Sequence, residues 1–362
     1  MSEPKGPLAR LKPVLAELQA YSVPAAPPPV KLDANESPWP LPEDVRRAIA
    51  DAVAALPFHR YPDGGATELR GALAEWLGAE PDELVIGAGS DEVIAMLMQA
   101  FATPSAGRAP TVLWPGPSFV MYRITGLTHG FVPVEVDLTP DFLLDRDAML
   151  AAFVEHRPAL AFYATPNNPS GNTFDETTLR ALIEANPDTL HILDEAYGFF
   201  AREPGGEAHT LAPWLADYPH VGVLGTLSKI GLAALRVGWV RLHPGLAAEI
   251  EKVRQPFNLS ATAQVAATVL LRDHPERMEE AAQSIVRERA RLHGALAERG
   301  LEPLPSAANF ILARVPRSAE APLLEGGVAL RFFDDPRLEG WARITVGTPT
   351  ETDALLAALD SF

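Results

Sequence analysis

The sequence reads His-Ile-Leu-Asp-Glu-Ala-Tyr at residues 191–197 and Val-Gly-Val-Leu-Gly-Thr-Leu-Ser-Lys at residues 221–229. Each stretch begins as a short apolar run of strand length and ends in a polar side chain, Asp194 in the first and Lys229 in the second. Open α/β sheets bind their ligands at the carboxyl ends of such strands. The two stretches therefore predict neighbouring strands with a functional site at their ends, although an isolated carboxylate and lysine would more often form a structural salt bridge.

The same alternation of apolar runs and helical stretches continues on both sides of these segments. Further strands are expected at residues 84–86, 111–114, 131–136, 159–164, 237–241, 310–315, 328–332 and 342–346. Helices are expected at residues 42–56, 66–77, 92–101, 176–185 and 275–299. Strands that alternate with helices predict an α/β fold with a largely parallel sheet covered on both faces.

The two ends of the chain differ from its middle. Residues 23–42 are rich in proline and predict an extended N-terminal arm. Beyond Gly245 a long charged helix and short strands predict a second, smaller α+β domain. The expected units are an arm with the start of the small domain at 1–42, a large domain at 43–245 and a small domain at 246–362.

Composition excludes several classes of protein. With 362 residues and 47% hydrophobic content, the chain is long enough for about two domains with a substantial core. Its net charge of −17 disfavours a nucleic-acid binder, which needs clustered Lys and Arg. It has no cysteine, and its nine histidines never fall within one helical turn of each other, so no metal site is expected. Without a signal-peptide or membrane-spanning pattern, we expect a soluble cytoplasmic protein.

Two loops rich in turn-forming residues lie where such a sheet would place a ligand. Thr-Pro-Asn-Asn-Pro-Ser-Gly at 165–171 follows a predicted strand and by itself indicates only a turn. Gly-Ala-Gly-Ser-Asp-Glu at 87–92 opens a helix, so its backbone N–H groups can hold a phosphate. Glu92 stands where a dinucleotide fingerprint has its third glycine, which makes a nicotinamide enzyme the weaker interpretation. Because carboxylates would repel a phosphate, we expect the Asp91 and Glu92 side chains to turn away.

These segments resemble the aminotransferase class I/II family, and within it the histidinol-phosphate aminotransferases most closely. The motifs that carry the family resemblance are Asn-Asn-Pro-Ser-Gly at 167–171, Asp-Glu-Ala-Tyr at 194–197, Ser-Lys at 228–229 and Arg236. Those that carry the narrower resemblance are Lys-Leu-Asp-Ala-Asn-Glu-Ser-Pro at 31–38, Tyr-Pro-Asp at 61–63 and Arg-Ile-Thr-Val-Gly-Thr at 343–348. The match runs from about Lys31 to Thr348, which is nearly the whole chain.

The resemblance implies a fold-type I enzyme that uses pyridoxal 5'-phosphate (PLP), with a mostly parallel seven-stranded sheet between helices. It implies that Lys229 holds PLP as a Schiff base and then moves a proton at the substrate Cα. Asp194 would pair with the protonated pyridine nitrogen. Tyr197 and Asn168 would hydrogen-bond the ring oxygen, and Phe119 would stack on the ring. Lys229, Asp194 and Tyr197 are thus the expected catalytic residues.

The resemblance also implies a phosphate site shared between two subunits. Its residues would be Ala88, Gly89, Ser90, Ser228, Arg236 and, from the second subunit of a homodimer, Tyr61. An arginine suits this role because its planar guanidinium binds a dianion through two hydrogen bonds and keeps its charge. The alternatives are that Arg236 is an ordinary surface arginine and that Tyr61 is an ordinary core residue.

The implied reaction is transamination between histidinol phosphate and 2-oxoglutarate or glutamate in histidine biosynthesis. Arg331, with Arg343 and Tyr21, would bind the substrate phosphate, and Arg343 would also bind the α-carboxylate of glutamate. Asn35 is a further expected substrate contact. The alternative for Arg331 is a surface position on an exposed strand.

Three other functions stay open at this point. A PLP-dependent decarboxylase of an O-phospho-amino acid would keep every cofactor residue and differ only toward the substrate. A general aromatic or aliphatic aminotransferase would differ in the same way. A non-enzymatic effector domain is disfavoured, because the chain is acidic and lacks an N-terminal helix-turn-helix domain.

Overall fold

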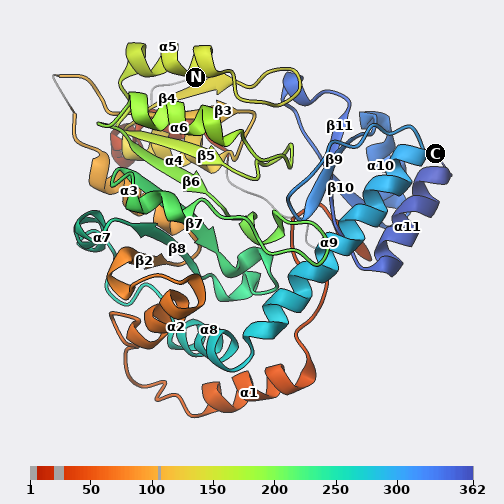
Figure 1. Ribbon diagram of the computed structural model, residues 1–362, viewed down its shortest axis with the longest axis horizontal. Coiled ribbons are helices and arrows are strands. Elements are labelled where there is room, and N and C mark those ends of the chain that lie inside the picture. Colours follow the sequence, from red (N-terminus) through yellow and green to blue (C-terminus); the bar gives the residue numbers. More distant parts are fainter. Residues whose placement is uncertain (1–5, 20–27, 105–106, 362) are drawn as a thin grey trace.

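A computed structural model describes residues 6–19, 28–104 and 107–361, and its strands form two sheets (Figure 1). The strands are β1 (Val30–Leu32), β2 (Leu84–Gly87), β3 (Thr111–Gly116), β4 (Val132–Asp137), β5 (Leu160–Ala164), β6 (Leu190–Asp194), β7 (Val221–Thr226), β8 (Gly238–Leu242), β9 (Phe310–Arg314), β10 (Val328–Phe332) and β11 (Trp341–Thr345). Every strand predicted from the sequence is confirmed. Among the described strands, β1 alone was not predicted.

The helices predicted from the sequence are also present, together with several that were not. The α-helices of the described residues are α1 (Glu43–Ala54), α2 (Thr67–Leu77), α3 (Ser90–Phe101), α4 (Met121–His129), α5 (Arg146–His156), α6 (Glu176–Ala185), α7 (Pro244–Glu251), α8 (Ala261–Asp273), α9 (Pro275–Glu298), α10 (Glu320–Glu325) and α11 (Pro349–Asp360). Side-chain caps mark several starts: Asp145 accepts the N–H of Ala148 before α5, and Asp175 accepts that of Thr178 before α6. Such caps satisfy N–H groups that have no partner inside the helix.

The large sheet has seven strands in the order β2-β8-β7-β6-β5-β3-β4. Strands β7, β6, β5, β3 and β4 run parallel, whereas β8 is antiparallel to both of its neighbours. The predicted largely parallel sheet is therefore confirmed. Because β5, β6 and β7 are parallel neighbours, the segments that follow them emerge at one edge of the sheet.

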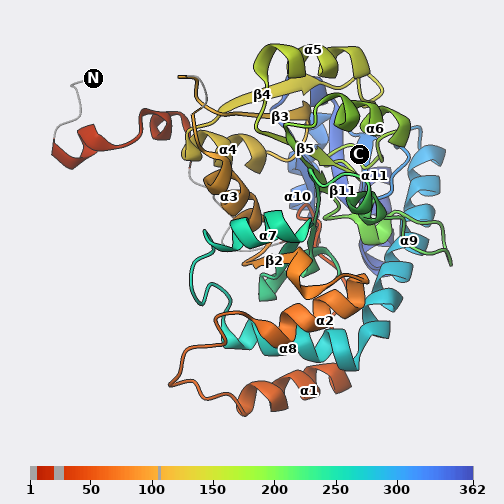
Figure 2. The same ribbon diagram turned by 60° about the vertical axis from the view of Figure 1, so that its left-hand side comes forward.

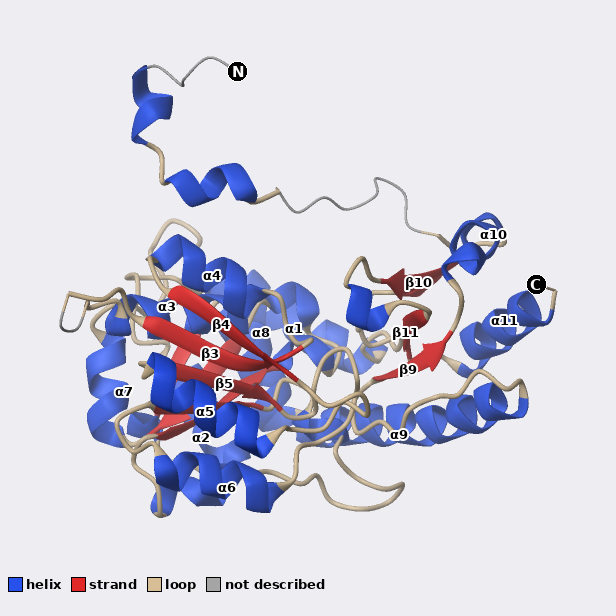
Figure 3. Cartoon of the chain, turned by 90° about the horizontal axis from the view of Figure 1, so that it is seen from above, coloured by secondary structure: helices blue, strands red, loops and turns tan. Residues whose placement is uncertain are grey.

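Both faces of the large sheet are covered, as the uninterrupted apolar strands predict. Strands β3, β5, β6 and β7 are buried along their whole length. Apolar residues of α3, α4 and α7 pack in one core cluster, and those of α5 and α6 pack in another (Figure 3). The sheet is thus the middle of three layers, and its strand ends are held rigidly.

The small sheet joins the two ends of the chain. Its order is β1-β10-β11-β9, with β1 parallel to β10 and the other pairs antiparallel. The proline-rich arm therefore contains a short strand, β1, which agrees with the predicted extended conformation. The predicted domain boundaries at 42/43 and 245/246 stay a prediction. Helix α8 lies beyond residue 245 but packs on α1 and α2, which lie in the predicted large domain.

The start of the described chain stands apart from the body of the molecule (Figure 2). It consists of two 3-10 helices, η1 (Gly6–Arg10) and η2 (Pro13–Glu17). Lys12 attaches this segment by donating a hydrogen bond from Nζ to the carbonyl oxygen of Thr128 in α4. Among the described residues, no helix combines the length and the apolar character needed to cross a membrane.

Candidate active site

A cavity of about 80 Å³ lies where β5, β6 and β7 end and α3 begins. It is lined by Ser90, Asp91, Phe119, Ala164, Asn168, Asp194, Ala196, Tyr197, Thr226, Ser228, Lys229 and Arg236. The cavity thus brings together most of the residues that the sequence predicts around a cofactor.

Asp194 is a buried carboxylate at the end of β6, with 5% of its surface exposed. Its Oδ2 accepts a hydrogen bond from the Tyr122 hydroxyl at 2.5 Å, and its Oδ1 accepts one from the N–H of Ala196 at 3.0 Å. Burial raises the pKa of Asp194 to about 6, while these two hydrogen bonds and the charge of Lys229 oppose that rise. Asp194 can therefore hold a proton-bearing nitrogen of a ligand.

Lys229 ends the short 3-10 helix η6 (Leu227–Lys229), which begins directly after β7. The turn is fixed by the Thr226 side chain, whose Oγ1 accepts the N–H of Ser228 at 3.1 Å. The Nζ atom of Lys229 lies 5.8 Å from the ring centroid of Tyr197. Within the described residues no carboxylate lies within 4.0 Å of this amine, so the structural salt bridge with Asp194 is not formed. The amine is thus available to a ligand.

Tyr197 connects the cavity to the small sheet. Its hydroxyl accepts a hydrogen bond from Nδ2 of Asn35 at 2.9 Å. Asn35 is 1% exposed, and its N–H donates to Oγ1 of Thr345 in β11 at 3.0 Å. Asn35, which was predicted to contact substrate, therefore lies behind Tyr197 and fixes the position of the tyrosine hydroxyl.

The start of α3 and Arg236 form a close-packed wall of the cavity. Gly89 has a φ of +85°, and a Cβ there would lie 2.4 Å from Nη2 of Arg236. A Cβ on Gly238 would lie 2.4 Å from the backbone nitrogen of Ser90. Nη1 of Arg236 donates to Oγ of Ser228 at 3.2 Å. Only glycine permits these approaches, which bring a guanidinium and a hydroxyl to the N-terminus of a helix, where anions are stabilised.

The prediction that Asp91 turns away from this wall is wrong. Asp91 lines the cavity, and its Oδ2 lies 3.3 Å from Nη2 of Arg236. The guanidinium attracts the carboxylate, and the first turn of a helix favours negative charge. Two of the predicted backbone donors are also occupied, because the N–H of Ala88 donates to the Glu92 carboxylate and that of Gly89 to the Gly87 carbonyl at 2.8 Å.

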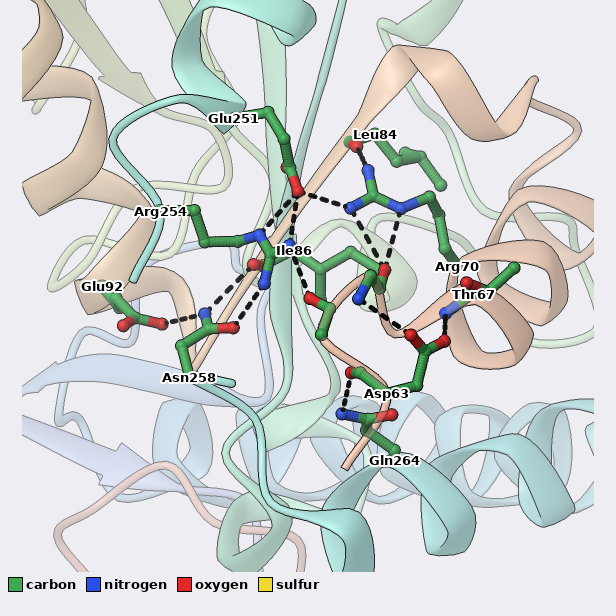
Figure 4. A network of polar contacts seen from close by, with 12 residues as sticks. Asp63, Thr67, Arg70, Leu84, Ile86, Glu92, Glu251, Arg254, Asn258 and Gln264 are labelled. Atoms are coloured by element: carbon green, nitrogen blue, oxygen red, sulfur yellow. Dashed lines mark hydrogen bonds and ion pairs between the residues drawn. The ribbon is translucent and has the colours of Figure 1, made fainter. Parts of the chain in front are cut away.

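Glu92 belongs to a polar network that reaches beyond the cavity (Figure 4). Besides the Ala88 N–H, its carboxylate accepts a hydrogen bond from Nδ2 of Asn258 at 2.7 Å. Arg254 donates to Oδ1 of Asn258 at 2.9 Å and to the carbonyl oxygen of Gly64 at 2.7 Å. The network therefore ties the start of α3 to the turn that precedes α2.

Tyr61 lies on that turn and not at the cavity of its own chain. It is 81% exposed, and its ring stacks on that of Phe257 at 4.7 Å between centroids. The interpretation of Tyr61 as a core residue is therefore wrong. Its predicted role at the site of a second subunit stays a prediction.

The predicted substrate arginines lie side by side on the small sheet. Arg331 of β10 and Arg343 of β11 are directly opposite each other, and Arg331 is exposed whereas Arg343 is 9% exposed. Nη1 of Arg343 donates to Oδ1 of Asn168 at 2.6 Å, which joins the small sheet to the cavity rim. Arg331 does not line the cavity. Tyr21 lies outside the described residues.

One residue with a direct part in the geometry was missed by the sequence analysis. Tyr122 is 0% exposed and donates to Asp194, which lies 72 positions later in the chain. The only local signal is its position one helical turn after Phe119, because residues at i and i+3 share a helix face. Nothing in that spacing identifies its partner.

The donor set fits PLP. PLP offers a phosphate dianion, an aromatic ring with a basic nitrogen, and a carbonyl that reacts with a primary amine. The cavity offers the Arg236 guanidinium beside Ser228 and Ser90, a buried carboxylate at Asp194, the Phe119 ring, and the Lys229 amine. Each chemical group of the cofactor thus has a matching side chain in one enclosure.

Comparisons with known proteins agree with this geometry. A family model described as aminotransferase class I and II matches residues 27–359. The chain is 41% identical over 357 residues to histidinol-phosphate aminotransferase 2 of Nitrosococcus oceani, with 96% of each protein covered. It is 40% identical over 349 residues to histidinol-phosphate aminotransferase 1 of Ralstonia nicotianae, covering 94% of this chain and 90% of the relative. The crystal structure of the Sinorhizobium meliloti histidinol-phosphate aminotransferase in complex with pyridoxal-5'-phosphate matches with a TM-score of 0.85 at 27% identity, covering 98% of this chain and 97% of that one.

Proposed function

The chain belongs to the aminotransferase class I and II family, and we propose that it is a PLP-dependent transaminase of histidinol phosphate in histidine biosynthesis. The second half-reaction consumes 2-oxoglutarate and forms glutamate. The observation that supports this best is a single cavity that contains the Lys229 amine, the Asp194 carboxylate and the Arg236 guanidinium.

PLP, when bound, supplies an aromatic system that accepts negative charge from the substrate Cα. Lys229 would hold the cofactor through its Nζ, and the same amine would move the proton at the substrate Cα. Asp194 keeps the ring nitrogen protonated, which strengthens charge acceptance. Tyr197, oriented by Asn35 at 2.9 Å, donates to the ring oxygen.

Arg331 and Arg343 bind the anionic groups that distinguish the two substrates. Histidinol phosphate carries a phosphate and no carboxylate, whereas glutamate carries two carboxylates. Guanidinium groups bind both kinds of anion through paired hydrogen bonds. Arg343 already contacts Asn168 at 2.6 Å, so it can meet a substrate carboxylate next to the cofactor.

We infer in addition that two copies form a twofold dimer with shared sites. Three large apolar side chains of this region are exposed in the single chain: Phe58 at 70%, Tyr61 at 81% and Phe257 at 43%. A second copy would cover them, and Tyr61 would then meet the phosphate of the neighbouring subunit. The absence of cysteine supports a cytoplasmic location.

The substrate proposal is tested with purified protein, histidinol phosphate and 2-oxoglutarate. Formation of glutamate without carbon dioxide is the expected result. Release of carbon dioxide from an O-phospho-amino acid would identify a decarboxylase instead. Glutamate formed from aromatic or aliphatic amino acids at a higher kcat/KM than from histidinol phosphate would point to a general aminotransferase.

The covalent role of Lys229 gives a direct labelling prediction. Borohydride reduction followed by peptide mapping should place the cofactor on Lys229. Lys229→Ala should bind PLP reversibly and carry no label. Lys252→Ala removes an exposed lysine that pairs with Glu249, and it should be labelled like the unchanged protein. A label on any other lysine would contradict the assignment.

A further inference from the structure

We propose that Tyr122 is a positioning residue for the cofactor, which holds the Asp194 carboxylate ionised and in one orientation toward the ring nitrogen. The proposal rests on the proposed role of Asp194. It extends that role to Tyr122 of α4, which does not line the cavity.

The geometry around Asp194 leaves its carboxylate little freedom. The Tyr122 hydroxyl donates to Oδ2 at 2.5 Å, and the N–H of Ala196 donates to Oδ1 at 3.0 Å. Both donors favour the charged form of the acid, and one on each oxygen fixes the plane of the group. Asp194 therefore presents a preset carboxylate to a ligand.

Tyr122 is itself held rigidly. Its ring stacks on Phe162 at 4.7 Å with an interplanar angle of 17°. It also packs edge-on against Phe119 at 5.6 Å with an angle of 86°. One buried side chain therefore touches both the ring that would stack on the cofactor and the carboxylate that would pair with its nitrogen.

Some of the other charged and titratable groups around Asp194 raise its pKa, and others lower it. Lys229, from the turn after β7, lowers its pKa, whereas Asp91, from the start of α3, raises it. Glu195 and Tyr197 follow Asp194 on its own segment, and Arg236 faces Asp91 at 3.3 Å. After burial, which raises the pKa of Asp194, the Tyr122 hydrogen bond is the largest influence, and it lowers that pKa.

The test is Tyr122→Phe, which keeps the ring and removes the hydroxyl. The dissociation constant of PLP is measured on the apo form of the full chain between pH 5.5 and 8.5, in the variant and the unchanged protein. Loss of a donor should move the carboxyl pKa up by about one unit, so the variant should bind about fivefold more weakly at pH 6 and almost equally above pH 8. Titration of PLP itself affects both proteins equally, so it cancels in the ratio of the dissociation constant of the variant to that of the unchanged protein.

Tyr163→Phe is the matched control. Tyr163 is also 0% exposed and lies on the neighbouring strand β5, but its hydroxyl is 3.2 Å from Nδ1 of His191 and it does not line the cavity. It should leave the ratio near one at every pH. A Tyr122→Phe ratio that does not change with pH, or one that Tyr163→Phe reproduces, would overturn the proposal.

A double-mutant cycle separates this proposal from its premise. In an Asp194→Asn background the effect of Tyr122→Phe on PLP binding should disappear, because no carboxylate remains to be ionised. Persistence of the full effect there would show that Tyr122 acts only through packing. An Asp194→Asn protein that binds PLP as well as the unchanged protein would instead refute the role of Asp194, and the proposal with it.

Discussion

Arg331 and Arg343 face each other across β10 and β11, and their guanidinium carbons lie 5.8 and 6.0 Å from the ring centroid of Phe333. Their environments differ, because Arg331 is exposed and Arg343 is largely buried against the cavity rim. This difference suggests a division of labour. The exposed arginine is free to meet a bulky phosphate, and the buried one is held by Asn168 for a carboxylate next to the cofactor.

Arg331→Ala should reduce kcat/KM for histidinol phosphate far more than for its dephosphorylated analogue. Loss of a charge-assisted contact costs about 1.5–3 kcal/mol, which is roughly 10- to 150-fold in kcat/KM. Steady-state kinetics with both compounds measure the difference. Arg314→Ala is a suitable control, because Arg314 is an exposed arginine of β9 in the same sheet. Equal losses with the two compounds would show that Arg331 does not recognise the phosphate.

His191 should make the free energy of unfolding depend on pH, and it has no proposed role in catalysis. It is 0% exposed in β6, where burial lowers its pKa to about 4. In the unfolded chain its pKa is about 6.5, so between these values only the unfolded state takes up the proton. The free energy of unfolding should therefore fall by about 2 kcal/mol between pH 7.5 and pH 5 on account of this residue.

The comparison protein is His191→Gln, which keeps a polar side chain and cannot titrate. Buried Asp194 and Glu195 have raised pKa values, so their contributions change with pH in the opposite sense in both proteins. Urea unfolding at the two pH values should give a stability difference between the proteins that shrinks at pH 5. A difference that stays constant would contradict the expected burial of a neutral histidine.

At the scale of elements, the junction between β2 and α3 depends on one glycine. Gly89 has a φ of +85°, and an added Cβ would lie 2.4 Å from Arg236. Gly89→Ala should weaken PLP binding about tenfold or more, because the Arg236 guanidinium, which is proposed to bind the phosphate, would have to move. Gly130→Ala is the control for an alanine at positive φ, since Gly130 has the same φ of +85°, with a ψ of 18°, and nothing within 4 Å.

Gly130→Ala should lose about 1–2 kcal/mol of stability, because Gly130 lies in the left-handed region. Gly89→Ala should lose more, because its φ of +85° and ψ of 169° lie in a region that is essentially restricted to glycine. Only Gly89→Ala should lose cofactor affinity as well, as measured by titrating the apo form with PLP. If the two variants bind PLP equally well, the wall at the start of α3 does not hold the phosphate.

Some helices and strands could be predicted from the sequence pattern, and others could not. Buried strands such as β5 are apolar runs, so all seven strands of the large sheet could be predicted. The strand order and the antiparallel direction of β8 could not. Helix α5 could not, because its apolar residues do not form one stripe: Met149 and Phe153 are buried, whereas Val154 is 78% exposed. Strand β1 has three residues after a run of prolines, which is too short for an alternating pattern to appear.

The residues of the candidate site also fall into those that the sequence pattern predicts and those that it does not. Asp194 ends one strand and Lys229 follows the end of the next, so the sheet topology places both side chains at the same cavity. The Tyr122 contact and the pairing of Asp91 with Arg236 depend on how α4 and α3 pack, and the latter partners are 145 positions apart. The local sequence pattern contains no information about such contacts. The orientation of Asp91 follows from the attraction between its carboxylate and the Arg236 guanidinium in the folded site.

At the scale of the whole molecule, shared sites in a dimer can be tested by mixing inactive subunits. Tyr61→Ala and Lys229→Ala should each abolish most activity. In a mixed dimer both lesions fall at one site and the other site is intact, so random mixing should restore about a quarter of the activity. Mixing Lys229→Ala with Asp194→Asn should restore none, because each site of that dimer keeps one lesion. Verified mixed dimers of the first pair without activity would rule out sharing.

The pairing of β1 with β10 has a consequence for the order in which the molecule can be built. All seven strands of the large sheet lie between residues 84 and 242, whereas Val30 pairs with Val328. On the ribosome the large sheet can form while β1 still waits for its partner to be synthesised, since domains fold as they emerge and distant contacts form late. Asn35 follows β1 directly, so its bond to Tyr197 becomes secure only after the small sheet closes. The newborn chain therefore acquires the scaffold of the large sheet first, and it completes its site only after β10 has been synthesised.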